Sequence, residues 1–421
     1  MEHVSNIVII FILAEFIPLI MIKKVKAINF KSFESIEIDL SDLNIVLGPN
    51  ASGKSNLASI FQFIRDIATL GLSNAISLQG GLEYLLNFKN SKKQQLELEI
   101  QFDKSQVVSF DRSNQVKFSD IYYNIKIYPF LKKKGMKKYI EEVSLKFTNP
   151  RDISADTANL RIISDNGRIR FEPEDVESEF LKTIHPFLMS LNINIKGEAR
   201  SLISSLTLFF ILGIGIPNFI QVYDFDPKLS KKAIPISGKA ELEPDGSNTA
   251  LVLRKMLENP EEKRRFIQYL KVCLPFVKDL SFENQVDKSI ILKVAESYNP
   301  GLEIPSSIIS DGTVEIVSLI YALFFDDKRL IVIEEPERNI HPHLIASLMH
   351  LVQEASNEKQ IIITTHSPEL IKYSRIEDLL IIERDRDGAS KVSRVSDKSS
   401  VKAFLKDNIG IEELFVDGIL N

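Results

Sequence analysis

The chain of 421 residues has a single cysteine, Cys273, and this scarcity excludes two classes of protein. One cysteine cannot form a disulfide within the chain, and it is too few for a zinc site built on cysteines. A chain of this kind suits the reducing conditions of the cytosol, so we expect a cytoplasmic protein.

Basic residues are not in excess. The chain has 52 Lys and Arg against 57 Asp and Glu, which gives a net charge of −5. This balance argues against a protein that binds nucleic acid over its whole surface, although it leaves a local basic patch open. Hydrophobic residues make up 44% of the chain, which indicates a globular protein with room for two or three domains.

Apolar runs long enough to cross a membrane are also lacking. Residues 7–22 are almost wholly apolar, but a span needs about 20 residues, and Glu15 and Pro18 interrupt this run. No Lys or Arg precedes the run and no cleavage site follows it, which argues against a signal peptide. We expect residues 1–20 to be an apolar N-terminal extension or a packed accessory helix, with a membrane anchor as the alternative. Residues 202–220 are similarly apolar, but their glycines and proline favour a buried helix over a membrane helix.

The strongest motif that is present is Gly48-Pro-Asn-Ala-Ser-Gly-Lys-Ser55, which has the spacing of a phosphate-binding loop, or P-loop. The apolar run 44–47 before it predicts a buried strand, and the apolar spacing of 56–65 after it predicts a helix. Backbone N–H groups at the start of such a helix bind phosphate. In this motif Lys54 reaches the β- and γ-phosphates of a nucleotide, and Ser55 ligates Mg²⁺.

Alternating apolar and polar residues predict antiparallel strands around this loop. The expected strands are two within 21–40 and one each at 96–102, 121–128, 139–147, 160–163 and 168–171. The last two flank Asp165-Asn-Gly167, a turn signal. The lysines of 132–138 lie at the tip of an expected hairpin, where a solvated turn is the simpler interpretation and a contact with nucleic-acid phosphates is the alternative. Residues 70–81 predict a loop or a broken helix.

The middle of the chain predicts an all-helical insertion. The expected helices lie at 176–191, after Asp245-Gly-Ser-Asn248, and from Pro260 onwards. Strands return near 289–292. No long heptad pattern, internal repeat or low-complexity linker occurs in the sequence, so no extended coiled-coil arm is expected.

Three further motifs follow in the last third of the chain. Glu334 and Glu335 come directly after the apolar strand 330–333, where ligands bind in open α/β sheets. His366 ends the apolar strand 361–365 in the same relative place, although a lone histidine is more often structural. Ser310-Asp-Gly-Thr313 opens an apolar helix, as a plain N-cap or as an anion-binding helix start.

The order of these motifs resembles that of ATP-binding-cassette ATPases, and more closely the branch with SMC, RecF and OLD-type proteins. Asn29-Phe-Lys-Ser-Phe33 is similar to the opening of that branch, and Glu334-Glu-Pro-Glu-Arg-Asn-Ile-His-Pro342 is similar to its Walker B motif and D-loop. Tyr223-Asp-Phe-Asp-Pro227, Glu243-Pro-Asp-Gly-Ser-Asn248 and Leu414-Phe-Val-Asp-Gly418 resemble segments of small OLD-like ATPases.

The resemblance implies a role for each matching residue. The ATP-binding residues would be Lys31, Ser32, Gly48, Pro49, Asn50, Ala51, Ser52, Gly53, Lys54, Ser55 and Asn56. Glu335 matches the catalytic base and His366 the switch histidine, and both would act together with Lys54. Ser55 and Glu334 would hold Mg²⁺, with Glu334 standing where many cassette ATPases have Asp.

The resemblance also implies that a second copy completes the site. Ser310, Asp311 and Gly312 match the signature that contacts the γ-phosphate of the opposite subunit. Asn339 and His341 match the D-loop at the same interface, and Gln79 is a candidate for the Q-loop glutamine. A homodimer or higher oligomer is therefore expected.

These observations predict an α/β fold, namely a two-lobed P-loop cassette-type ATPase head with a central mixed or parallel sheet and a mainly helical insertion. The expected parts are the extension 1–20, an N-terminal lobe 21–172, an insertion or lid 173–284 and a C-terminal lobe 285–421. Only 55 residues follow His366 (421 minus 366), too few for the TOPRIM nuclease domain of OLD proteins. The acidic cluster 383–387 is expected at a hairpin tip between two terminal strands. Neither nuclease activity nor DNA bridging is therefore carried over.

The predicted function is an ATPase that couples its nucleotide state to a separate effector subunit, a nuclease or a toxin, in prokaryotic DNA repair or antiphage defence. One alternative is an ATP-dependent scaffold with negligible turnover. Another is the nucleotide-binding subunit of a transporter, against which the Asn29–Phe33 opening and the long insertion argue. Binding of nucleic acid stays open, and membrane association is not expected.

Overall fold

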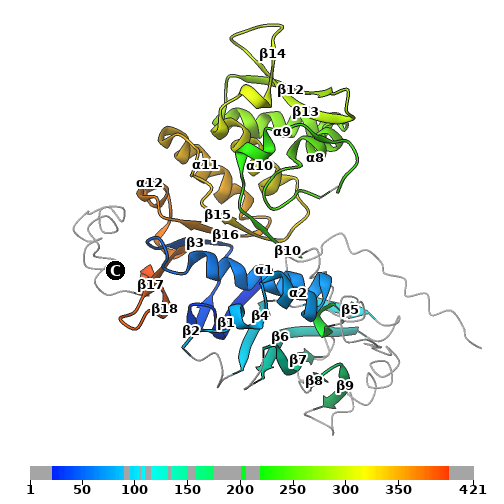
Figure 1. The fold of residues 1–421 in the computed structure, drawn as a ribbon, viewed down its shortest axis with the longest axis vertical. Coiled ribbons are helices and arrows are strands. Elements are labelled where there is room, and N and C mark those ends of the chain that lie inside the picture. The colour runs from blue at the N-terminus through cyan, green and yellow to red at the C-terminus, as the bar shows by residue number, and fades with distance from the viewer. Residues whose placement is uncertain are drawn as a thin grey trace, which may run out of the picture.

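The structure is a computed structural model that describes residues 21–89, 95–103, 106–109, 115–130, 134–148, 158–173, 201–204, 219–239 and 241–397. Two sheets face each other across helix α1 (Lys54–Leu70), and helices cover the outer face of the second sheet (Figure 1). A third, small sheet lies with its helices at the far end of the molecule (Figure 1). The P-loop, the acidic residues Glu334 and Glu335, and His366 map to the second sheet and α1.

The first sheet is antiparallel throughout, in the order β2-β1-β4-β6-β7-β8-β9, with β5 paired to β6. Its strands are β1 (Met21–Phe30), β2 (Phe33–Asp39), β4 (Leu96–Asp103), β5 (Gln106–Ser109), β6 (Gln115–Pro129), β7 (Met136–Thr148), β8 (Ala158–Asp165) and β9 (Arg168–Pro173). Every strand predicted between 21–40 and 168–171 is confirmed. Asn166 (φ 49°) and Gly167 (φ 84°) form the predicted tight turn, in which both central residues need positive φ.

The second sheet carries the P-loop strand, in the order β10-β15-β16-β3-β17-β18. Its strands are β3 (Leu43–Leu47), β10 (Ile220–Tyr223), β15 (Leu330–Glu334), β16 (Gln360–Thr365), β17 (Leu379–Arg384) and β18 (Ser390–Arg394). All pairs are parallel except β17 with β18. The hairpin predicted around 383–387 is confirmed by that last pair.

Alternate residues of the parallel strands are buried in two separate cores. Val46 and Val332 face α1 and the antiparallel sheet. Ile45 and Ile331 face the helices on the other side. Burying each such side chain contributes about 1.5–3 kcal/mol. Because both faces are covered, these strands are continuous apolar runs.

Five helices of eight residues or more pack on this sheet or beside it. They are α1, α8 (Thr249–Met256), α9 (Pro260–Cys273), α10 (Asp311–Phe324) and α11 (Pro342–Ala355) within the described ranges. The shorter elements are α2 (Leu72–Leu78), α3 (Leu82–Leu85), α7 (Pro227–Ser230), α12 (Pro368–Lys372), η1 (Leu202–Ser204), η2 (Ser306–Ile308), η3 (Ile376–Asp378) and η4 (Val395–Asp397). The broken helix predicted at 70–81 is confirmed as α2, which lies between Gly71 and Gly80.

The prediction of an all-helical insertion is wrong for the part of 173–284 that the structure describes. β10 belongs to the parallel sheet, and β11 (Ile234–Pro235) and β12 (Val277–Asn284) form the small sheet with β13 (Ser289–Glu296) and β14 (Glu303–Pro305). β10 has four residues, all buried, and pairing with β15 supplies its backbone partners. Such a short apolar run cannot be told from the end of a helix by periodicity. Helices α8 and α9 are confirmed, whereas 176–191, 205–218, 1–20 and 414–418 lie outside the described residues.

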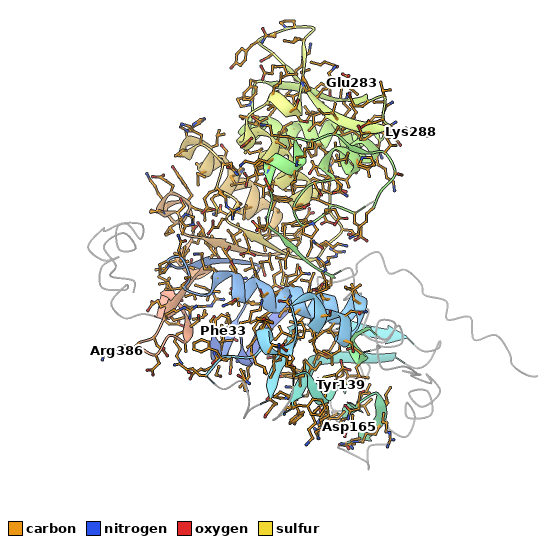
Figure 2. All side chains as sticks on the ribbon, viewed as in Figure 1. Phe33, Tyr139, Asp165, Glu283, Lys288 and Arg386 are labelled. Carbon is orange, nitrogen blue, oxygen red and sulfur yellow. The ribbon has the colours of Figure 1, made fainter. Side chains whose placement is uncertain are left out.

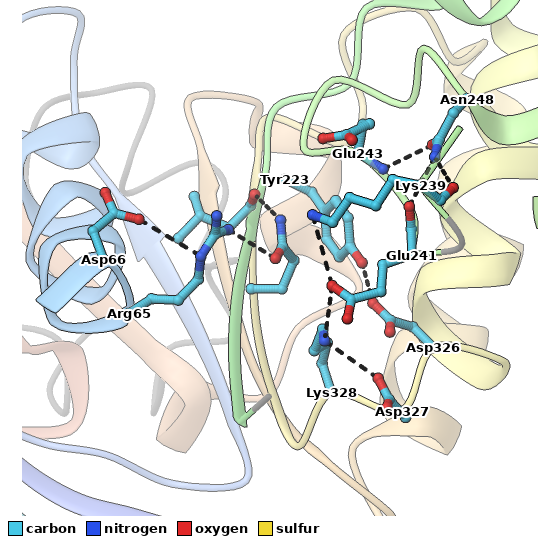
Figure 3. Close-up of polar contacts among 12 residues, drawn as sticks. Arg65, Asp66, Tyr223, Lys239, Glu241, Glu243, Asn248, Asp326, Asp327 and Lys328 are labelled. Atoms are coloured by element: carbon cyan, nitrogen blue, oxygen red, sulfur yellow. Dashed lines mark hydrogen bonds and ion pairs between the residues drawn. The ribbon is translucent and has the colours of Figure 1, made fainter. Parts of the chain in front are cut away.

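Polar contacts fasten the edge strand β10 on both sides (Figure 3). Arg65 of α1 donates to Gln221 Oε1 at 2.8 Å, and the hydroxyl of Tyr223 is bonded to Asp326 after α10. Beyond the strand, the amide of Asn248 donates to the carbonyl of Glu241 at 2.8 Å and so closes the loop that leads to α8. The segment that resembles a lid is thus anchored in the same sheet as the P-loop.

Within the described ranges, no helix has the length and apolar character needed to cross a lipid bilayer.

Candidate functional site

The P-loop connects the carboxyl end of β3 to α1 in the predicted strand–loop–helix arrangement. Ala51 (φ 63°) and Gly53 (φ 122°) have positive φ, so the loop curls tightly. A Cβ on Gly48 would lie 2.5 Å from the carbonyl oxygen of Ile382, which leaves no space for a side chain. Residues 49–51 are exposed and 52–54 are buried, so the tip of the loop is open to solvent.

Lys54 lies inside the loop. Its Nζ donates to the carbonyl oxygens of Gly48 at 2.8 Å and Pro49 at 3.2 Å. Burial lowers the pKa of Lys54, while the carboxylates of Glu335, Glu337 and Glu334 raise it. The ammonium of Lys54 is therefore bonded to two neutral carbonyl oxygens. A charged phosphate oxygen accepts a stronger hydrogen bond, so a bound phosphate can take the place of these carbonyls.

Two acidic residues at the end of β15 meet the P-loop and the neighbouring strand. Ser55 Oγ donates to Glu334 Oε2 at 2.6 Å, and burial raises the pKa of Glu334. Glu335 Oε1 lies 3.1 Å from Nδ1 of His366, which follows β16. Ser55 and Glu334 are 279 positions apart in the sequence, and the fold brings them into contact.

Glu335 has a strained backbone. Its φ is 44°, a region that costs a residue with a side chain on the order of 1 kcal/mol or more. Its N–H donates to the carbonyl of Thr364 at 2.9 Å, which fixes the turn. Arg338, not considered from the sequence, lies 3.4 Å from Glu335 and 3.3 Å from Asp224. The backbone turn and these contacts hold the carboxylate of Glu335 at the carboxyl end of β15, beside the P-loop.

Ser55 and Glu334 are suitable ligands for Mg²⁺. Both offer oxygen atoms, which this ion prefers, and they are already adjacent. The described residues contain no cluster of three or more His, Cys, Asp or Glu that could enclose a metal. Mg²⁺ in nucleotide sites uses one or two protein oxygens together with phosphates and water, so this small donor set fits the ion.

Residues before the P-loop lie beside it, as the resemblance implied. Ser32 Oγ accepts from Asn56 Nδ2 at 2.8 Å. Lys31 (φ 46°) donates to Gln79 Oε1 at 2.9 Å, and burial lowers its pKa. Gln79 therefore contacts the residue next to Ser32, while its assignment to the Q-loop stays a prediction.

The signature residues and the D-loop contact each other. Ser310 Oγ caps α10 by accepting from the N–H of Thr313 at 3.2 Å. A Cβ on Gly312 would lie 2.4 Å from the carbonyl oxygen of Asn339, so the D-loop rests directly on the helix. Asn339 also donates to the buried Glu315 at 2.7 Å.

The outer residues of the same region have other partners. Asp311 forms an ion pair with Lys231 at 2.8 Å, and His341 Nδ1 lies 2.6 Å from Nδ1 of His343. The contacts of the signature are thus with Lys231 directly after α7, with Thr313 and with the D-loop of its own chain. Its predicted contact with the phosphate of a second copy stays a prediction.

Sequence reasoning missed two residues that touch the P-loop. Arg384 and Ser390, on the hairpin β17–β18, bond to the carbonyls of Ala51 and Ser52. No motif marks them, because an arginine and a serine beside a turn are common in any surface hairpin.

A P-loop beside parallel strands that end in acidic residues and a histidine defines a P-loop ATPase of the α/β class. The chain belongs to the family described as "AAA domain, putative AbiEii toxin, Type IV TA system", which matches residues 43–372. This membership confirms the expected AAA-type ATPase. The order β10-β15-β16-β3-β17-β18, with helices on both faces, confirms the expected α/β fold with a central mixed or parallel sheet.

Individual relatives are distant. An "ATP/GTP phosphatase" of Helicobacter pylori is 22% identical over 388 residues, which cover 87% of this chain and 90% of the relative. The Septu protein PtuA of Bacillus thuringiensis is 29% identical over 94 residues, 21% of this chain and 24% of that protein. An Smc head domain of Pyrococcus yayanosii, solved with a coiled coil and joint, aligns over 92% of this chain and 99% of its own, with 12% identity and a TM-score of 0.46.

Proposed function

We propose that the protein binds ATP with Mg²⁺ and hydrolyses it at a site shared by two copies of the chain, and that the nucleotide state controls a separate effector. The observation that carries the proposal is the meeting of Ser55 with Glu334 and of Glu335 with His366 at the mouth of the P-loop. The family and the similarity to an ATP/GTP phosphatase support a nucleotide as the substrate.

Each residue has a separate task in hydrolysis. The loop N–H groups and Lys54 bind the phosphates, with Lys54 leaving the carbonyls of Gly48 and Pro49. Glu335 accepts a proton from the attacking water, and His366 orients the carboxylate and the γ-phosphate. When bound by Ser55 and Glu334, Mg²⁺ would neutralise charge on the phosphates.

The start of α10 supports the shared site. Ser310 is exposed, and the neighbouring Ile308 is 73% exposed. The start of a helix can bind an anion, and an exposed apolar residue beside it can contact another protein. In the proposed dimer, the γ-phosphate of the ATP bound to the partner copy would lie at this helix start. An isolated copy would then lack these groups and hydrolyse ATP slowly.

The catalytic assignment is tested by Glu335→Gln in the full chain. We expect ATP turnover to fall at least about 100-fold while ATP binding persists, because only the base is removed. The exposed Glu358→Gln, which makes the same change of charge away from the site, should hydrolyse ATP at the wild-type rate. Equal turnover in both variants would remove Glu335 from the mechanism.

The shared site is tested by the mass of the protein in solution with and without ATP. Glu335→Gln should accumulate as a dimer in ATP and Mg²⁺ and return to monomer in ADP, measured by light scattering. A monomer mass in both nucleotides would contradict a site shared between copies. ATP-dependent dimerisation of a wild-type protein without turnover would instead support the scaffold alternative.

The effector is proposed to be a nuclease or toxin subunit that acts in antiphage defence or DNA repair. The similarity to Septu protein PtuA and the description of the family support the defence setting. Purification of the tagged chain from its own host, with the Lys54→Ala variant as the control, tests this. The coupling would be supported by a nuclease or toxin that co-purifies in different amounts with the wild type and with the variant, when the difference depends on added nucleotide. The absence of such a protein from both preparations would contradict it.

A further inference from the structure

The hairpin β17–β18 lies beside both β3 and the P-loop that follows it. β17 pairs in parallel with β3, from Leu379 opposite Ile45 to Ile381 opposite Leu47. Both strands therefore end at the same edge of the sheet, where β3 becomes the P-loop and β17 leads into its turn (Figure 1). The hairpin bonds there to two successive carbonyl groups of the loop.

Ser390 makes the inner of these bonds and is fully buried. Its Oγ lies 2.5 Å from the carbonyl oxygen of Ser52 and 2.8 Å from Ser32 Oγ. A carbonyl only accepts, so the single proton of Ser390 goes to Ser52, and the hydroxyl of Ser32 supplies the other bond. The N–H of Ser390 also donates to the carbonyl of Ser32 at 2.9 Å. One serine thus joins the turn after β1 to the P-loop.

Arg384 makes the outer bond. Its Nε donates to the carbonyl oxygen of Ala51 at 2.7 Å, and its Nη1 donates to the carbonyl of Gly388 at 2.6 Å. The second bond holds the guanidinium against its own hairpin turn. Ala51 has φ 63°, so this arginine contacts the one P-loop residue that combines a side chain with a positive φ.

These bonds fix the direction of the loop N–H groups. In a trans peptide the C=O and N–H point in opposite directions. Holding the carbonyls of Ala51 and Ser52 on the hairpin side therefore turns the following N–H groups away from the hairpin. The N–H of Ser52 bonds to Pro49 at 3.2 Å within the loop, whereas Gly53 starts α1 with no side-chain cap. A Cβ on Gly53 would lie 2.4 Å from Ser390 Oγ, so the contact also requires glycine.

We propose that Arg384 and Ser390 are positioning residues for phosphate binding, which act by anchoring two P-loop carbonyls so that the loop N–H groups face the α- and β-phosphates. This inference rests on the proposed binding of ATP. It assigns a role in the nucleotide site to a hairpin that follows His366, the last of the motifs assigned to that site, and it does not require either residue to touch the nucleotide.

The test compares Arg384→Ala with Arg386→Ala in the full chain. Arg386 is exposed on the same turn and offers an equal change of charge (Figure 2). Dissociation constants for ATP and for ADP are measured by calorimetry, together with the thermal midpoint of each protein. We expect Arg384→Ala to weaken ATP and ADP by the same factor, about tenfold, with an unchanged midpoint. Arg384→Lys, which can still donate to Ala51, should recover most of the affinity, and Arg386→Ala should match the wild type.

Other outcomes would overturn the inference in different ways. Equal affinities for Arg384→Ala and Arg386→Ala would show that the anchor is not needed. Weakening of ATP alone would mean that Arg384 touches the γ-phosphate, because both nucleotides share the phosphates that the loop cradles. Loss of affinity in step with a lower midpoint would make Arg384 a stabiliser of the fold.

A second variant tests the bond between Ser390 and the carbonyl of Ser52. Ser390→Ala removes the bond to Ser52 and should weaken ATP and ADP equally, with an effect that adds little to that of Arg384→Ala because both act on one loop. Strictly additive effects would contradict a common mechanism. A wild-type protein that binds neither nucleotide would refute the proposed function itself, whereas a wild type that binds both leaves the variants as the test of this inference alone.

Discussion

Glu315 lies at the contact between α10 and the D-loop, and its protonation should make the free energy of unfolding depend on pH. It is 2% exposed on α10, and its Oε2 accepts from the amide of Asn339 at 2.7 Å. Burial raises its pKa from 4.5 to about 7, opposed by the bond from Asn339 and by Arg338, while the charges of Glu337 and Asp311 raise it further. A single neutral donor is a weak partner for a buried carboxylate.

The sign of the effect follows from these two pKa values. Between pH 4.5 and about 7 the folded protein holds a proton on Glu315 that the unfolded chain has lost. The contribution to stability is therefore complete below pH 4.5 and disappears as the pH rises through about 7. The difference between the two values is about 2.5 (7 minus 4.5), which at 1.36 kcal/mol each corresponds to about 3 kcal/mol.

Glu315→Gln should remove this dependence, because glutamine stays neutral and its carbonyl still accepts from Asn339. We expect the variant to be more stable than the wild type by up to about 3 kcal/mol at pH 8 and by no more than about 1 kcal/mol at pH 5. The assay is chemical unfolding at several pH values, with the exposed Glu358→Gln as the matched control. Taking the difference between proteins at each pH cancels the titration of the other buried groups. A difference that does not change with pH would refute the assignment of a buried, protonated Glu315.

Two further changes test the geometry of the same site. Gly312→Ala places a Cβ 2.4 Å from the backbone oxygen of Asn339, and should destabilise the fold by about 1–3 kcal/mol and lower ATP turnover more than ATP affinity; a larger loss in affinity would contradict the contact. Ser55→Ala removes one of the two proposed Mg²⁺ ligands, so the Mg²⁺ concentration needed for half-maximal ATP binding should rise while ADP binding without Mg²⁺ stays the same. A calorimetric Mg²⁺ titration identical to that of the wild type would argue against this assignment.

The sequence predicted those features that depend on neighbours in the chain. The Asn166–Gly167 turn, the alternation within the antiparallel strands and the apolar runs of the parallel strands each have a local physical cause. The carboxyl ends of parallel strands lie at one edge, so the meeting of Glu335 with His366 also followed from the pattern. Ser310 was expected to cap a helix and does so.

Contacts between distant segments were beyond local reasoning. Ser390 is 338 residues from Ser52, and Gln79 is 48 residues from Lys31. Neither pair has a spacing or composition that distinguishes it from other polar residues. β10 was missed for a related reason, since four apolar residues become a strand only when β15 supplies their hydrogen-bond partners.

The position of β3 in the sheet also has a consequence for biosynthesis. Translation produces the antiparallel sheet first, and all its described strands find their partners between residues 21 and 173. β3 is made early as well, but its two neighbours begin only at Gln360 and Leu379. On the ribosome, the five buried residues of β3 therefore wait for more than 300 residues of nascent chain and are a natural ligand for chaperones until then. A chain that still lacks β16 and β17 thus has no strand on either side of the one that carries the P-loop.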